Sequence, residues 1–312
     1  MNRSAYFLVG PTGAGKSGVA QHLAEVRGVP ILSADSMAIY RGMDIGTAKP
    51  SVEERGKVPY FGVDLVEPDV AFSAWDYRKH ALASLATVSE TCNAIVVGGT
   101  GLYIKSLTDG LSDRPGGNAA LRDVWEKRLH AEGIEALQDA LRDAAPDVFE
   151  GIVDKQNPRR LLRALETVGS PSQPRKWSRN DDAIVVGLSI APELLNVRIA
   201  QRVDAMYDQG LIVEVEQLLS RNASLSKTAL QAIGYAEAMA LIAGRMTQGE
   251  ARERTIIRTR RLAKRQRTWF RHQANAIWVE VTAESTVESL AAEVAERWRE
   301  YGPTAIRSEC EA

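Results

Sequence analysis

The sequence has few of the residues that cross-link small secreted domains or hold metal ions. Of 312 residues, only Cys92 and Cys310 are cysteines and only four are histidines. Two cysteines are too few for a disulfide framework, and they do not have the spacing of metal ligands. We therefore expect the protein to reside in a reducing cytoplasm. No apolar run approaches membrane-spanning length, and the N-terminus shows no charged leader or cleavage site. We therefore expect neither a membrane anchor nor a secretory leader.

An excess of charge of one sign is also missing. The chain has 39 basic and 40 acidic residues, so any binding to a polyanion must come from local clusters. With 45% hydrophobic residues, the chain can bury a sizeable core in one large domain or two smaller ones.

Short apolar runs rich in β-branched residues alternate with stretches of helical periodicity. The predicted strands are Ala5–Val9, Pro30–Ala34, Ala94–Val97, Ala183–Ile190 and Ile277–Val281. This alternation is typical of an α/β fold with a parallel sheet.

The strand signals vanish between Pro115 and Asp154. Apolar residues recur there at helical spacing, for example Leu137 and Leu141. We therefore predict a helical insertion over residues 113–156, within a core formed by residues 1–112 and 157–312.

A phosphate-binding loop motif, GPTGAGKS, follows the first predicted strand and precedes a helix over Val19–Val26. Glycines let backbone N–H groups turn toward phosphate oxygens, and the helix N-terminus adds positive charge. Ser17 is positioned in the motif to ligate Mg²⁺. The predicted phosphate-binding residues are Gly10, Thr12, Gly13, Ala14, Gly15, Lys16 and Ser17.

Two further loops end at the same predicted sheet edge. Asp35 follows the second strand, either as a carboxylate that accepts a proton from substrate or as a helix cap or turn carboxylate. The segment Gly98–Tyr103, GGTGLY, follows the third strand. Thr100 within it can bind a phosphate oxygen or cap a helix.

Five spaced motifs resemble the tRNA dimethylallyltransferase family, also called isopentenyl-diphosphate:tRNA transferases. They follow the phosphate loop GPTGAGKS and read SADSMAIYRGMDIGTAKP, GGTGLYIKSL, NPRRLLRALE, QAIGYAEA and RTRRLAKRQRTWFR. The resemblance implies a core like that of phosphate-loop (P-loop) NTPases and an insertion that grips tRNA. It also implies transfer of a dimethylallyl group from dimethylallyl diphosphate to N6 of adenine 37, beside the anticodon.

The resemblance also implies roles for individual residues. Asp35 would orient the adenine amino group and accept its proton, and Thr100 would join it in catalysis and diphosphate binding. Predicted contacts to the tRNA anticodon stem-loop are Asp35, Ser36, Met37, Ala38, Thr100, Arg122, Arg159, Arg160, Leu161, Leu162, Arg163, Gln231, Gly234, Tyr235, Arg258 and Arg261. Ala38 and Ala236 depart from residues common in the family, and Val58–Asp64 lacks its usual paired histidines.

The segment Arg252–Arg271 is dense in basic residues. Arg254, Arg258, Arg261 and Arg265 recur along one helical face, and nearby acidic residues are few, which favours phosphate binding over internal ion pairs. Trp269 and Phe270 are expected to anchor this helix in the core.

Other functions share part of this pattern. A P-loop kinase acting on a small metabolite would share the loop, the fold and Mg²⁺. Prenyl transfer to free adenine nucleotides would share the chemistry, and a non-enzymatic RNA-binding module would share only the basic segment. The direction of Arg198 and Arg202 toward the diphosphate stays open, and we expect a monomer.

Overall fold

The computed structural model describes residues 3–89, 93–111, 119–169, 180–221 and 224–307. Two compact units divide the chain. The core unit comprises Met1–Leu111 and Ser178–Glu309, and the second unit, the insertion, lies within Ser112–Trp177.

Seven strands form the sheet of the core unit. They are β1 (Ser4–Val9), β2 (Ile31–Ser33), β3 (Tyr60–Phe61), β4 (Ile95–Gly98), β5 (Ile184–Ile190), β6 (Asn275–Val281) and β7 (Thr304–Ala305). The order is β3-β2-β4-β1-β5-β6, all parallel, and β7 pairs antiparallel with the start of β1. The five predicted strands are confirmed. Strands β3 and β7 were not predicted, because two residues carry no periodic signal.

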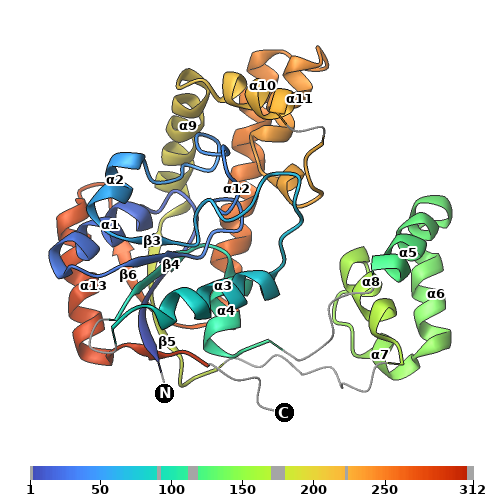
Figure 1. Ribbon diagram of the computed structural model, residues 1–312, viewed down its shortest axis with the longest axis horizontal. Coiled ribbons are helices and arrows are strands. Elements are labelled where there is room, and N and C mark those ends of the chain that lie inside the picture. Colours follow the sequence, from blue (N-terminus) through green and yellow to red (C-terminus); the bar gives the residue numbers. More distant parts are fainter. Residues whose placement is uncertain (1–2, 90–92, 112–118, 170–179, 222–223, 308–312) are drawn as a thin grey trace. The chain divides into compact units, whose positions relative to one another are not determined.

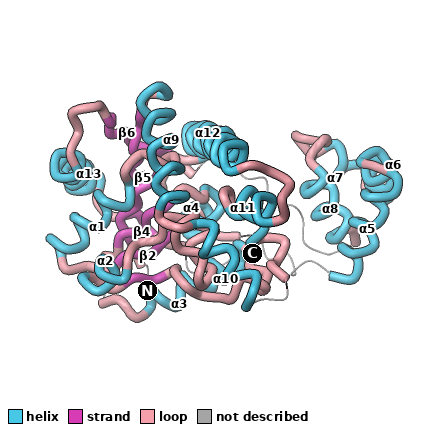
Figure 2. Tube along the Cα trace, turned by 90° about the horizontal axis from the view of Figure 1, so that it is seen from above, coloured by secondary structure: helices cyan, strands magenta, loops and turns pink. Residues whose placement is uncertain are grey.

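The helices of the core unit cover both faces of this sheet. They are α1 (Lys16–Arg27), α2 (Val52–Lys57), α3 (Ala74–Ala86), α4 (Gly101–Thr108), α9 (Pro192–Asp208), α10 (Leu211–Arg221), η1 (Ala229–Gln231), α11 (Tyr235–Ile242), α12 (Gln248–Gln273) and α13 (Val287–Tyr301). Figures 1 and 2 show α1 and α13 on one side of the strands and α4 on the other.

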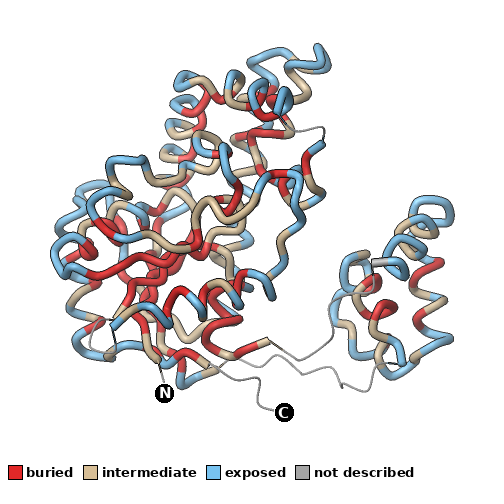
Figure 3. Tube along the Cα trace, in the orientation of Figure 1, coloured by how far each residue is buried: buried red, intermediate tan, exposed pale blue. Residues whose placement is uncertain are grey.

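Alternation along β1 separates two hydrophobic clusters. Leu8 packs with Val19 of α1 on one face, whereas its neighbour Phe7 packs with Tyr103 of α4 and Phe270 of α12 on the other. Successive strand residues point to opposite faces, so one buried strand supports both layers. The central strands β1, β2, β4 and β5 are mostly buried (Figure 3).

The insertion consists of helices with a small core of its own. They are α5 (Ala119–Glu132), α6 (Ile134–Ala144), α7 (Pro146–Glu150) and α8 (Pro158–Thr167). Leu137 and Leu141, one turn apart on α6, pack with Leu161 and Leu165 of α8. The predicted start of the core at residue 157 is therefore wrong. The apolar face of α8 is buried against α6, and the insertion extends past α8.

Candidate active site

The phosphate loop follows β1 at the carboxyl ends of the parallel strands. Gly10 has φ 138° and passes so close to β5 that a Cβ there would lie 2.7 Å from the carbonyl oxygen of Leu188. Gly15, with φ 95°, directly precedes Lys16, the first residue of α1. The backbone therefore turns as the motif predicted, with the N-terminus of α1 at its end.

Lys16 lies beneath this loop with only 8% of its surface exposed. Its Nζ donates to the carbonyl oxygen of Pro11 at 2.7 Å. Burial lowers the pKa of Lys16 to about 7, against the opposing charge of Asp35, and the positive charge of Arg202 lowers it further. A bound anion beside Lys16 would favour its charged form.

Arg202 brings a second cation to the loop from α9. Its guanidinium donates to the Thr12 hydroxyl at 3.0 Å and to the Thr47 carbonyl at 3.3 Å. Burial lowers the pKa of Arg202, and the charge of Asp35 raises it. Helical spacing alone gave no direction for this side chain, whereas the packing of α9 turns it toward the loop. Arg198 has no polar partner in the described part of the chain.

Asp35 and Thr100 lie on two loops that are tied together at the same sheet edge. The Thr100 backbone N–H donates to the Ala34 carbonyl at 3.2 Å, and the Ser36 N–H donates to the Thr100 hydroxyl at 3.1 Å. A Cβ on Gly98 would lie 2.2 Å from the Ala34 carbonyl oxygen, so only glycine permits this approach. The structure thus brings the β2 and β4 loops together.

The hydrogen bonds of Thr100 and Asp35 bear on whether these residues act as caps. The Thr100 side chain makes no capping hydrogen bond to α4, although the residue stands at the N-cap position. Oδ1 of Asp35 accepts from the Met37 N–H at 2.8 Å, as in a turn. Its second oxygen accepts no hydrogen bond within the described residues, so that oxygen is free for a substrate.

Several residues that were predicted to contact tRNA, in the segment after Asp35 and in the QAIGYAEA motif, are buried. Ser36 and Met37 are half-buried and Gln231 is exposed. Ala38 is buried, and Tyr235 is fully buried with its hydroxyl donating to Glu214 at 2.6 Å.

Gly234 is also buried, and its N–H donates to Glu237 at 2.9 Å. A Cβ on Gly46 would lie 2.4 Å from the Tyr235 ring. The side chains of Ala38 and Tyr235 therefore pack inside the core unit, and contact of these two residues with RNA stays a prediction.

The predicted residues of α8 separate into exposed arginines and buried leucines. Arg159 and Arg160 are exposed, whereas Leu161 and Leu162 belong to the core of the insertion. The apolar stripe of α8 packs inward, so these two side chains stabilise the insertion, and their contact with RNA stays a prediction.

Two further arginines of the insertion share a buried acid. Arg122 of α5 and Arg163 of α8 lie 3.5 and 3.3 Å from the carboxylate of Glu166, whose side chain has no exposed surface. Arg122 also pairs with Glu126 of α5 at 3.2 Å, so two arginines and two carboxylates share this surface.

The basic helix α12 has more acidic partners than its local sequence suggested. Arg258 pairs with buried Glu237 of α11 at 2.5 Å, and Arg252 pairs with Asp208 of α9 at 2.5 Å. The expectation that acidic partners are nearly absent is wrong, because they come from the neighbouring helices α11 and α9. Arg261 and Arg265 are exposed and have no acidic partner among the described residues.

The aromatic residues at the end of α12 anchor the helix as predicted. Phe270 is fully buried, and Trp269 packs edge-on against it with ring centroids 5.0 Å apart. A Cβ on Gly101 would lie 2.3 Å from the Trp269 ring.

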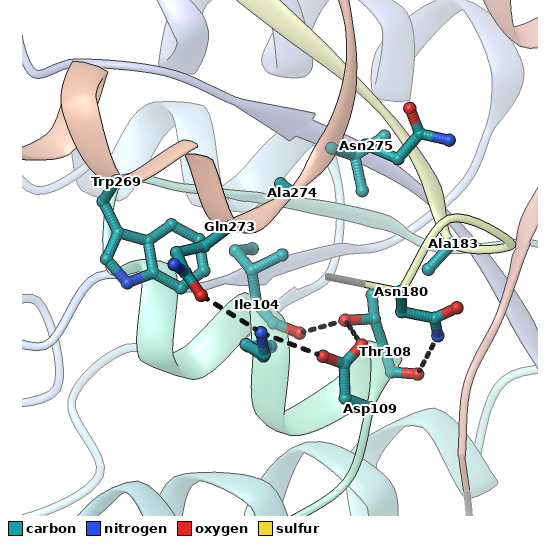
Figure 4. Close-up of a pocket in the computed structure, with 11 residues that line it drawn as sticks. Ile104, Thr108, Asp109, Asn180, Ala183, Trp269, Gln273, Ala274 and Asn275 are labelled. Carbon is teal, nitrogen blue, oxygen red and sulfur yellow. Dashed lines mark hydrogen bonds and ion pairs between the residues drawn. The ribbon is translucent and has the colours of Figure 1, made fainter. Parts of the chain in front are cut away.

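A pocket lies at the opposite end of the strands, where β5 and β6 begin (Figure 4). Buried Lys105 lies there 3.4 Å from both Asp109 and the side chain of Gln273. The Asn180 amide donates to the Thr108 carbonyl at 3.3 Å. These contacts join the chain segments that precede and follow the insertion, away from the phosphate loop.

Side chains that bind metals do not cluster in the described part of the protein. No group of three or more His, Cys, Asp or Glu side chains is arranged there to hold a metal ion. Ser17 is exposed on the first turn of α1, beside the phosphate loop. One hydroxyl suits Mg²⁺, which usually keeps several waters and binds substrate phosphates. In the same part of the chain, no helix is long and apolar enough to cross a membrane.

Parallel strands, a complete phosphate loop and cations beneath it define a P-loop NTPase-like protein. The family described as IPP transferase matches residues 38–273. The chain belongs to this family.

Relatives extend over most of the chain. It is 42% identical to a tRNA dimethylallyltransferase of Geobacter metallireducens, covering 87% of this chain and 90% of the relative. It is 38% identical to a tRNA dimethylallyltransferase of Corynebacterium jeikeium, over 90% and 93%.

Solved structures agree with this assignment. The full-length tRNA isopentenylpyrophosphate transferase of Bacillus halodurans is 32% identical, with a TM-score of 0.69 over 96% of this chain and 98% of that one. A eukaryotic dimethylallyltransferase acting on tRNA, 21% identical, shares the fold with a TM-score of 0.76, over 98% of this chain and 81% of that one.

Proposed function

We propose that this protein transfers a dimethylallyl group from dimethylallyl diphosphate to N6 of adenine 37, beside the anticodon of tRNA. The observation that carries the proposal is the pair of cations, Lys16 and Arg202, at a phosphate loop that shares its sheet edge with Asp35. A family of transferases whose named relatives act on tRNA supports the choice of substrates.

The loop and its cations suit the leaving group. When the allylic carbon–oxygen bond breaks, negative charge builds up on the departing diphosphate. Backbone N–H groups of the loop, Lys16 and Arg202 lie where they can stabilise it. Removing one such donor typically raises a reaction barrier by about 3 kcal/mol. The Ser17 hydroxyl is the group that would hold Mg²⁺, which adds further positive charge against the diphosphate when bound.

Asp35 and Thr100 suit the acceptor. An adenine amino group is a poor nucleophile because its lone pair is delocalised into the ring. The unbonded carboxylate oxygen of Asp35 can orient this group and take a proton as the nitrogen–carbon bond forms. Thr100, on the neighbouring loop, is held by Ser36 with its hydroxyl facing the same segment. The base must leave its stack in the anticodon loop to reach them.

Exposed basic residues provide the RNA surface. On the insertion these are Arg159 and Arg160, with Arg122 and Arg163 around Glu166. On the core unit, Arg261 is exposed on α12, and Gln231 is exposed at η1. Arg258 pairs with Glu237 and so holds α11 against this surface of α12.

We propose that the protein acts as a monomer in the cytoplasm, where its substrate is found.

Parallel incubations with labelled donors test this function. Labelled dimethylallyl diphosphate should transfer its label to tRNA, and labelled ATP should transfer no phosphate to either RNA or small molecules. Free adenosine and AMP serve as alternative acceptors. Phosphate transfer from ATP without prenylated RNA would identify a kinase, and prenylation of AMP in preference to tRNA would identify a nucleotide prenyltransferase.

A further inference from the structure

Helix α12 reaches the reacting edge of the sheet with one amide side chain. Gln266 lies on this helix, and its Oε1 accepts from the Thr12 N–H of the phosphate loop at 2.8 Å. Its Nε2 donates to the Gly99 carbonyl of the β4 loop at 3.0 Å. One side chain therefore joins the two loops, using both its acceptor and its donor.

The β4 loop is shaped to receive this side chain. A Cβ on Gly99 would lie 2.3 Å from Gln266 Nε2, and one on Gly101 would meet Trp269, one helical turn further along α12. Gly99 does not have a positive φ, so its backbone is open to other residues. The close approach of α12 therefore accounts for the missing side chain at Gly99.

The contacts of Gln266 continue on both sides. Thr12 is also held by Arg202, which donates to its hydroxyl. On the other side, Gly99 precedes Thr100, whose backbone and hydroxyl bond the segment Ala34–Ser36 around Asp35. Through Gln266, the groups that suit the diphosphate and those that suit the acceptor base are connected by direct hydrogen bonds.

We infer that Gln266 is a positioning residue that holds the phosphate loop and the Thr100–Asp35 loops at one separation, so that donor and acceptor meet in reactive geometry. This inference rests on the proposed prenyl transfer. Displacement of reacting groups by about 1 Å can lower a rate by about a hundredfold, even when both substrates still bind. The expected signature is a slower chemical step with nearly unchanged binding.

Single-turnover prenyl transfer with saturating tRNA and donor is the measurement. Gln266→Ala should lower the rate by about tenfold to a hundredfold. Affinity for inorganic diphosphate and for tRNA should stay within about threefold. Gln248→Ala, an exposed glutamine in the first turn of the same helix, is the matched control and should change nothing. A Gln266→Ala rate within about twofold of wild type would overturn the inference.

A second variant tests the geometry itself. Gly99→Ala should clash with the Gln266 amide and slow transfer, whereas adding Gly99→Ala to Gln266→Ala should cause little further loss because the clash is gone. Losses that multiply in the double variant would contradict the inference.

The same cycle in thermal stability tests this contact without relying on activity. Stability losses that simply add would count against the contact. A wild-type protein that prenylates no tRNA would instead refute the proposed function.

Discussion

In the core unit, charged groups converge on one edge of a large sheet, whereas the insertion carries its arginines on the outside of a small helical core. Lys16 and Arg202 are held by the phosphate loop, and burial lowers the pKa of both side chains. Arg159 and Arg160 lie exposed on α8. The difference separates two tasks: the core unit stabilises charge in a fixed geometry, and the insertion offers a charged surface to a large partner.

Replacing Asp35 should have the largest effect on the transfer rate, and this effect should arise in the core unit alone. Asp35→Asn keeps the shape and the turn hydrogen bond but removes the basic oxygen, so single-turnover transfer should fall by about a hundredfold or more. Melting temperature and affinities for diphosphate and tRNA should hardly change, because asparagine suits a turn about as well as aspartate. Asp69→Asn, at an exposed position, is the control. Transfer at a near wild-type rate would remove Asp35 from the mechanism.

Replacing Lys16 should weaken donor binding without changing RNA binding. Lys16→Ala should lower donor affinity and turnover together by about a hundredfold, because it removes a charge-assisted hydrogen bond to the diphosphate. Binding of tRNA, measured by filter retention, should stay the same. Lys79→Ala removes an exposed lysine of α3 and serves as the control. Unaltered donor kinetics in Lys16→Ala would contradict the role of this residue.

The insertion should unfold separately from the donor site when its core is damaged. Leu141 is fully buried in a cluster of few residues, so Leu141→Ala should destabilise the insertion by about 2–5 kcal/mol. Hydrogen exchange should speed up across α5 to α8 and tRNA affinity should drop, while diphosphate affinity stays constant. Val124→Ala, at a 59% exposed position of α5, should change stability by less than about 0.5 kcal/mol. Loss of diphosphate binding in Leu141→Ala would refute this independence.

Two arginine groups of α12 should differ in their effect on salt dependence. Replacing exposed Arg261 and Arg265 by alanine should reduce the slope of log affinity for tRNA against log salt by about 1 for each phosphate that the protein no longer neutralises. Arg258→Ala should instead lower stability, because it leaves the buried carboxylate of Glu237 without its nearest partner. An equal change in slope for Arg258→Ala would show that this arginine binds phosphate directly.

Regular local signals made most of the fold predictable. The five longer strands and the phosphate loop follow from short apolar runs and one motif, and the helices of the insertion follow from the spacing of Leu137 and Leu141. The limit of the insertion was misplaced because nothing local to α8 says which unit its apolar face packs against.

The candidate site was predictable only where a motif names its residues. The partners of α12 lie outside the helix: Glu237 of α11 for Arg258, and the distant residues Thr12 and Gly99 for Gln266. Burial of Tyr235 likewise depends on Glu214 and Gly46, which only the tertiary fold brings to it. The glycine at position 99 was the one available signal for Gln266, because a missing side chain indicates close approach without naming the neighbour.

Nucleoside analysis of the product shows directly whether the protein prenylates adenine 37 of tRNA. Unmodified tRNA would be incubated with the protein, Mg²⁺ and dimethylallyl diphosphate, then digested, and its nucleosides and anticodon-loop fragments would be separated by mass. Prenyl transfer to this adenine predicts an adenosine carrying one five-carbon prenyl group on N6, confined to the position beside the anticodon and absent with Asp35→Asn. Unmodified adenosine at that position after complete turnover of the donor, or a phosphorylated product instead, would contradict it.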